Sequence, residues 1–253
     1  MNQKTEKEIE WMRESGRILA TVLEILKKSA TIGISPKQLS KIAAKELKKM
    51  GGKPAFLGVS GQGQEIDFPD IICISVNDQV QHSIPTDQPL REGDIVNFDF
   101  GVIYRGMITD AGITVGIGKI SPKNQMLIST TKRALYKGIS QVKNGARVGD
   151  ISNAIEKELS SNSLGIVQEL VGHGVGHKLH EEPEIPNYGP PKSGPVLRSG
   201  MTIAIEPIAN LGSHRIYVDI DGWTIRTEDK SNSAQFEHTV LVTDSGCEIL
   251  TTI

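Results

Sequence analysis

Apolar residues recur near the start of the chain at intervals of three to four positions, the spacing of one helix face. The apolar and small positions of this face are Met12, Gly16, Leu19, Leu23 and Leu26. Thr5 is followed three positions later by Glu8, a pair typical of a capping box at a helix start. The pattern therefore predicts a first helix that begins after Thr5.

A second helix is predicted from Pro36 to Lys49. Ser35 is suited to cap it, Pro36 suits its first turn, and Gln38 stands three positions after the cap. Two glycines at positions 51 and 52 then end the helical pattern.

The rest of the chain alternates between strand-like and helix-like stretches. Strands are predicted at 71–76, 95–100 and 106–117, helices at 123–142 and from 150 to before 165, and mostly strands over 201–253. Helices and strands segregated in this way favour an α+β fold with an antiparallel sheet. No Pro- or Ser-rich linker divides the chain, so a single domain over 1–253 is expected.

Two segments 112 residues apart resemble each other. The residues Gly33, Leu39, Ser40, Lys45, Glu46 and Leu47 match Gly145, Ile151, Ser152, Lys157, Glu158 and Leu159. One interpretation is a chance similarity between two amphipathic helices. The other is a duplicated unit of two helices and a sheet, closed into one domain.

Composition narrows the class of protein. The chain has 28 Lys and Arg residues against 30 Asp and Glu, and this balance argues against nucleic-acid binding over the whole surface. No apolar run approaches the roughly 18 residues of a membrane helix, and the charged N-terminus is followed by no apolar signal segment. Cys73 and Cys247 form neither a disulfide framework nor a CxxC zinc site, so we expect a reduced, cytoplasmic location.

Two apolar strands each carry an aspartate. If the turn between them centres between Tyr104 and Arg105, Asp99 and Asp110 face each other directly. Like charges so placed repel, and their apolar flanks leave a bound cation as the simplest remedy. The alternative is a register off by one or two positions, with each Asp a solvated turn residue.

Further acids and histidines stand in apolar or glycine-rich segments. Glu206 ends one apolar strand and Glu237 lies in another. A lone strand carboxylate is usually solvated, but four carboxylates in four apolar strands are less easily explained in that way. His173, between glycines, is followed by two more histidines within eight residues, so a His-only zinc cluster is a further reading. A phosphate loop at 172–176 is disfavoured because no Lys-Ser/Thr follows. The histidines expected at the surface or in structural roles are His177, His214 and His238.

Taken together, the motifs resemble those of type I methionine aminopeptidases, over nearly the whole chain. They are NFDFG with Asp99, TDAG with Asp110, GHGVG with His173, HEEP with His180, IEP with Glu206, FEHT with Glu237, QHSIP with His82 and DGWT with Trp223. The resemblance implies the pita-bread fold, with two pseudo-symmetric halves of two helices and antiparallel sheet, roughly 1–118 and 119–253, around a central metal site. The 112-residue repeat is consistent with it.

The resemblance also implies an activity and a metal site. The activity is metal-dependent removal of the initiator methionine from nascent proteins whose second residue is small, by a water that two metal ions activate. The implied ligands are Asp99, Asp110, His173, Glu206 and Glu237, with Asp110 and Glu237 bridging two divalent ions (Co, Mn, Fe or Zn). Glu206 would also move the proton of the water, His180 would donate to the oxyanion, and His82 would contact the leaving-nitrogen side.

The substrate pocket departs from the family pattern. Residues 57–69 form a longer stretch than the LGYHGYP-like segment of relatives, Phe56 matches a common Cys, and Leu179 matches a usual aromatic. The expected methionine pocket is Phe56, Phe68, Leu179 and Trp223, with His82 and His180 beside the substrate. The resemblance further implies a monomer, transient ribosome contact, and one monovalent cation near Asn77, Gln79 and Ser233.

Three other functions remain open at this point. A Xaa-Pro aminopeptidase or prolidase shares the fold but usually carries an extra N-terminal domain. A metal-free pita-bread binding module at the ribosome loses ligands, whereas all five acid and His positions are present here. A binuclear hydrolase on an unrelated fold is opposed by the order of the motifs.

Overall fold

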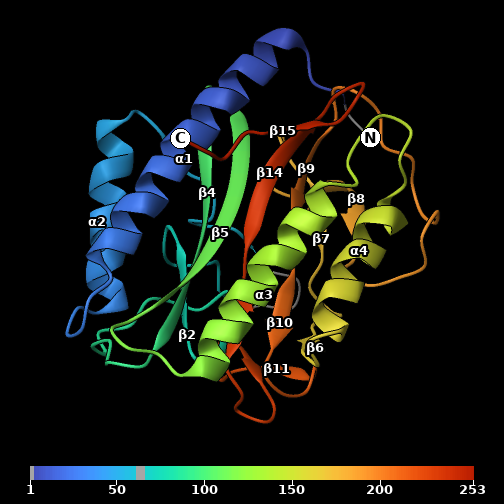
Figure 1. Cartoon of the computed structure of the whole chain (residues 1–253). Helices are drawn as coiled ribbons and strands as arrows, with labels where there is room; N and C mark the ends of the chain where they lie inside the picture. Colours follow the sequence, from blue (N-terminus) through green and yellow to red (C-terminus); the bar gives the residue numbers. More distant parts are fainter. Residues whose placement is uncertain (1–2, 61–65) are drawn as a thin grey trace.

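In the computed structural model, which describes residues 3–60 and 66–253, both N-terminal helices begin as the sequence predicts. Helix α1 (Glu6–Ser29) has a capping box between Thr5 and Glu8, and α2 (Pro36–Lys49) has one between Ser35 and Gln38. The apolar face of α1 packs on the central strands β4 and β5. Figure 1 shows α1 running across these strands with α2 beside it.

An antiparallel sheet forms the centre of the fold. Its strands are β1 (Lys53–Pro54), β2 (Cys73–Val76), β4 (Ile95–Tyr104), β5 (Met107–Gly116), β7 (Gly172–Gly174), β8 (Glu181–Ile185), β9 (Thr202–Ile205), β14 (Glu237–Val242) and β15 (Cys247–Ile249). The main path runs β1-β4-β5-β14-β9-β7-β8, with β2 also on β4 and β15 on β14. Strands far apart in the sequence are therefore neighbours in the middle of the sheet.

Among the residues that the structure describes, two small sheets lie outside this path. One joins β3 (Gln79–Gln81), β12 (Ile225–Thr227) and β11 (Ile216–Val218); the other joins β6 (Gly165–Ile166), β10 (Ile208–Asn210) and β13 (Ser233–Gln235). They bring the segments around His82, Trp223 and Gln235 next to the main sheet.

The predicted register of β4 and β5 is wrong. Asp99 pairs with Gly112 and Asp110 with Gly101, because the turn centres one position later than expected. The two aspartates are diagonal neighbours on one face, since side chains alternate along a strand. The alternative of solvated turn residues is also wrong, because both side chains are buried.

A second pair of helices covers the other half of the sheet. Helix α3 (Pro122–Ile139) matches the prediction closely, and α4 (Val148–Ser160) begins two residues earlier than predicted. The residues matched at a separation of 112 occupy equivalent places: Leu39 and Ile151 are both buried, and Gly33 and Gly145 both have φ near +90°. Such equivalence favours duplication over chance, while the boundary between the halves stays a prediction.

Strands β7 and β8 form a hairpin that the sequence did not predict as strands. The three-residue β7 is largely glycine, a residue depleted in strands, so its period-2 pattern is too short to detect. Its glycines are needed because an ideal Cβ on Gly174 would contact the Glu182 carbonyl.

Glycine also lets α1 approach the C-terminal segment. An ideal Cβ on Gly16 would overlap the carbonyl oxygen of Leu250. No helix within residues 3–60 and 66–253 is both long and apolar enough to cross a membrane.

Candidate metal centre and active site

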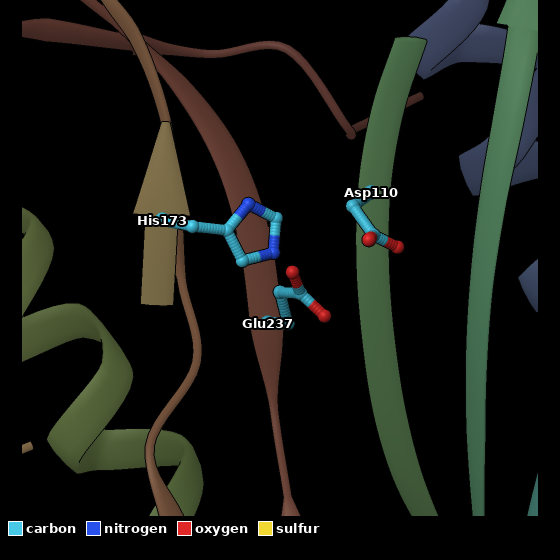
Figure 2. A group of neighbouring side chains, drawn as sticks. All are labelled: Asp110, His173 and Glu237. Carbon is cyan, nitrogen blue, oxygen red and sulfur yellow. The ribbon is translucent and has the colours of Figure 1, made fainter. Parts of the chain in front are cut away.

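Three predicted metal ligands converge from three strands. Asp110 comes from β5, His173 from β7 and Glu237 from β14, and one potential ligand atom of each lies within 4.8 Å of the others. All three residues are buried. Figure 2 shows the His173 ring and the two carboxylates pointing toward a common space.

Asp99 and Glu206 border the same space but lie outside that tight group. Glu206 directly follows β9, and its Oε1 is 3.7 Å from His173 Nε2. Burial, then the charges of Asp99 and Asp110, raises the pKa of Glu206 well above its ordinary value. Burial and the charge of Asp110 do the same to the pKa of Asp99. The four carboxylates therefore repel one another in a region that water hardly reaches.

Oxygen atoms of this cluster lack hydrogen bonds. Among the described residues, Asp99 Oδ1, Asp110 Oδ1 and Glu237 Oε1 are buried without a hydrogen-bond partner. A buried, unpaired carboxylate oxygen is costly unless it is paired or coordinates a metal. Divalent cations are bound by such oxygen ligands together with an imidazole, so the donor set fits a metal centre.

The ring of His173 is oriented as a metal ligand requires. Its Nδ1 donates to the Gly174 carbonyl over 2.9 Å, which leaves Nε2 as the acceptor facing the carboxylates. Burial, and then the neighbouring His180, lowers the pKa of His173 to about 3. The ring is thus neutral at physiological pH, with a lone pair directed into the cluster.

A hydrogen-bond chain that the sequence reading missed supports the ligands. Gln235 Nε2 donates to Glu237 Oε2 over 2.9 Å, and Asn97 Nδ2 donates to Gln235 Oε1 over 2.8 Å. All three side chains are buried. The available signal was a spacing of two: Gln235 precedes Glu237, and Asn97 precedes Asp99, by two positions in apolar segments.

A cavity of about 510 Å³ contains the cluster: all five predicted metal ligands line it together with apolar side chains. All four residues predicted for the methionine pocket line it, namely Phe56, Phe68, Leu179 and Trp223. Phe68 and Trp223 meet edge to face with ring centroids 5.2 Å apart. The Trp223 indole N–H donates to the Ile66 carbonyl over 2.9 Å, which fixes this wall of the cavity. Residues 61–65 of the lengthened 57–69 stretch lie outside the described residues.

The pattern of metallopeptidase family M24 matches residues 10–244. This chain belongs to family M24. It is 43% identical over 250 residues to methionine aminopeptidase 1 of Bacillus subtilis and, equally, to the methionine aminopeptidase of Clostridium perfringens, covering 99% of this chain and 98% of each relative. The resemblance stated from the motifs is thereby confirmed.

Solved structures agree on the M24 pita-bread fold. The crystal structure of methionine aminopeptidase from Thermotoga maritima superposes with a TM-score of 0.96 at 40% identity, covering all of both chains. A Xaa-Pro dipeptidase from Bacillus anthracis gives 0.79 at 21% identity, and this chain covers 62% of its length. That second likeness shows the shared fold alone.

A second, more open cavity of about 690 Å³ adjoins the first in this M24 chain. The two cavities share His82, His173, His180 and Glu206. The rings of His173 and His180 meet at right angles, with centroids 4.5 Å apart. Burial, then the neighbouring His180, lowers the pKa of His82 to about 4, and burial also lowers the pKa of His180. Both rings are neutral at physiological pH.

The remaining predicted residues are not among the clustered ligands. His177 and His214 are exposed, and His238 contacts Thr251 and Tyr136. Asn77 has φ of +58° and its carbonyl accepts from the Ser233 amide over 2.9 Å. The monovalent cation near Asn77, Gln79 and Ser233 stays a prediction.

Proposed function

We propose that this chain is a metal-dependent aminopeptidase that removes the N-terminal methionine of polypeptides. The observation that carries the proposal is the joining of a buried Asp/His/Glu cluster to an apolar, aromatic-lined cavity. A cluster of this kind suits hydrolysis, and the cavity suits a single unbranched apolar side chain. Thioether sulfur makes favourable contacts with aromatic rings such as Phe68 and Trp223.

Five residues would hold two divalent ions: Asp99, Asp110, His173, Glu206 and Glu237. Bound there, the ions supply Lewis acidity and activate a water molecule for attack on the first peptide carbonyl. Asp110 and Glu237 would each help to hold both ions. The combined charge of four buried carboxylates supports a requirement for two divalent cations rather than one.

The residues around the cluster would handle protons. Glu206 lines both cavities, where its carboxylate could accept a proton from the attacking water and pass it to the leaving amine. A neutral His180 ring can donate an N–H to the oxygen that becomes negative. The neutral His82 ring lies beside both cavities, where the leaving nitrogen would pass.

Two features support selectivity at the ends of the substrate. The apolar residues Phe56, Phe68, Leu179 and Trp223 line the same cavity as the predicted metal ligands, which fits the binding of the first side chain next to the reacting peptide bond. The second residue of the substrate would then lie among His82, His180 and Glu206, where the cavities meet, so a small side chain is favoured there.

Finer parts of the proposal follow from the family resemblance. The ions would be drawn from Co, Mn, Fe or Zn, since the ligand set does not select strongly among them. The substrates would be nascent chains, met during transient ribosome contact, and the enzyme would act as a cytoplasmic monomer.

The test is hydrolysis of Met-Ala-Ser by chelator-treated protein after anaerobic return of Mn(II), Co(II), Fe(II) or Zn(II). Leu-Ala-Ser and Ala-Pro-Ser serve as parallel substrates for a retuned pocket and for Xaa-Pro activity. We expect metal-dependent release of methionine and binding of two ions per chain. No release from any peptide by metal-loaded protein would contradict the proposal and favour a binding module.

Variants separate the roles within the site. Asp110→Ala or Glu237→Ala should abolish turnover and metal binding together. His180→Ala should lower turnover and leave metal content unchanged, and His214→Ala, an exposed histidine, is the matched control. Full activity in either carboxylate variant would show that the ligand assignment is wrong.

A further inference from the structure

The N-terminal segment contacts the loop that carries His180. Lys4 lies just before α1, and its Nζ is 2.8 Å from Oε2 of Glu181, the residue that follows His180. The Lys4 side chain is 0% exposed and that of Glu181 is 9% exposed. The Lys4 backbone N–H also donates to the Gly200 carbonyl over 2.8 Å, so the lysine is held at both ends.

Glu181 in turn closes the loop on itself. Its Oε1 accepts from the backbone N–H groups of His177 over 2.6 Å and of Lys178 over 3.0 Å. One buried carboxylate therefore joins the N-terminal segment to both ends of residues 177–181. Although burial raises the pKa of Glu181, the hydrogen bonds from Lys4 and Lys178 lower it overall, so the carboxylate is ionised.

A second contact reinforces this arrangement from the surface. Glu8 Oε1 is 2.7 Å from His177 Nε2, and the pKa of Glu8 is lowered to about 2 by that hydrogen bond first. Gly176 allows the Lys4 side chain to lie close to this loop, because an ideal Cβ on Gly176 would overlap that side chain. The loop is thus held by the N-terminal segment at Lys4 and by the first turn of α1 at Glu8.

The His180 ring has little else to hold it. Within residues 3–60 and 66–253 it makes no hydrogen bond, and its ring contact is the perpendicular one with His173. The direction of its N–H therefore depends on the backbone of residues 177–181. Donors that stabilise a developing charge act only when they are already directed at it.

We propose that Lys4 and Glu181 are positioning residues that hold His180 against the substrate carbonyl, so that the N-terminal segment is part of the active site. This inference rests on the proposed function, in which His180 donates to the oxyanion. The alternative is that the pair contributes only to folding stability.

The test compares Lys4→Met/Glu181→Gln, which removes both charges, with wild type. The double variant avoids the large penalty of leaving one buried charge unpaired. We expect kcat for Met-Ala-Ser to fall about 10- to 100-fold, the size expected when a reacting group is misplaced by about 1 Å. KM and metal content of the double variant should stay near the wild-type values. The single variant Lys4→Arg, which keeps the positive charge, should keep much of the wild-type activity.

The matched control is the exposed pair of Arg13 and Glu248, whose charged atoms are also 2.8 Å apart. Arg13→Met/Glu248→Gln should leave kcat unchanged. A second readout needs no turnover: in histidine-labelled protein loaded with Zn(II), the NMR signal of the His180 ring should move in Lys4→Met/Glu181→Gln while that of His214 does not.

The outcomes separate the two claims. If wild type releases methionine but the double variant keeps kcat within twofold and the His180 signal does not move, the positioning role is overturned, even if the protein melts at a lower temperature. If wild type releases no methionine, the proposed function fails, and the His180 signal alone then decides whether the pair orients the ring.

Discussion

Replacing Asp110 by Asn should change stability in opposite directions with and without metal. The substitution keeps the shape of the side chain and an oxygen that can accept from the Ala111 amide, but it removes one of four clustered negative charges. Without metal, the negative charge of Asp110 is repelled by the neighbouring carboxylates and lowers the stability of the folded protein. With metal, the Asp110 carboxylate is a proposed ligand of the ions and stabilises the folded protein.

The pKa of Asp110 gives the size of the effect. Burial raises it from 3.8 to about 7, against the opposing hydrogen bond from the Ala111 amide. Between these pH values the native state binds more protons than the unfolded state, so the stability of metal-free protein falls as pH rises through this window. At about 1.4 kcal/mol per pH unit the loss approaches about 4 kcal/mol above pH 7. Asp99 and Glu237, whose pKa values burial also raises, act in the same direction.

The assay is urea unfolding at pH 5.5 and pH 8, with chelator and with added Mn(II). We expect chelated wild type to lose stability between the two pH values, and chelated Asp110→Asn to be more stable than wild type at pH 8. Added metal should reverse that order by stabilising wild type. Asp87→Asn, at an exposed position, makes the same charge change away from the site and should alter neither comparison. A chelated variant less stable than wild type at pH 8 would refute the reasoning.

Three further predictions follow from contacts already described. Gln235→Leu should weaken metal affinity about 10- to 100-fold by removing the donor to Glu237, and unchanged affinity in a metal titration would contradict this. Trp223→Ala should lower kcat/KM for Met-Ala-Ser by about 10- to 100-fold, because the free energy of burying the methionine side chain against Trp223, about 1.5–3 kcal/mol, is lost. An equal loss at pH 8 on a substrate without Met would contradict a methionine pocket. Gly16→Ala should destabilise the protein by about 1–3 kcal/mol in urea unfolding, since its Cβ meets Leu250, and wild-type stability would disprove that contact.

The sequence predicted the helices well because their signals are local. Capping boxes at Thr5 and Ser35 stand directly before long amphipathic runs. The five candidate ligands could be named from motifs, but not their arrangement. Asp99 and Asp110 are diagonal neighbours because the turn between β4 and β5 centres one position later than the residue pattern suggested. Arg105 has a positive φ in this turn.

The motifs could not identify residues that act on the site through another side chain. Gln235 is read as an ordinary strand residue until its amide is seen to join Glu237 to Asn97. The bond between Lys4 and Glu181 spans 177 residues, and no periodicity relates the two positions. Such pairs are defined by the folded topology, so only the structure reveals them.

The proposed ligands are divided along the chain: Asp99 and Asp110 precede α3, whereas His173, Glu206 and Glu237 follow it. If the backbone were opened in the turn between β5 and α3, each fragment would carry an incomplete set of donors. The divalent ions would then be bound by ligands from both fragments, and the affinity of one fragment for the other should rise with metal concentration. In the intact chain the same division means that the set of proposed ligands is complete only when β5 and β14 are paired.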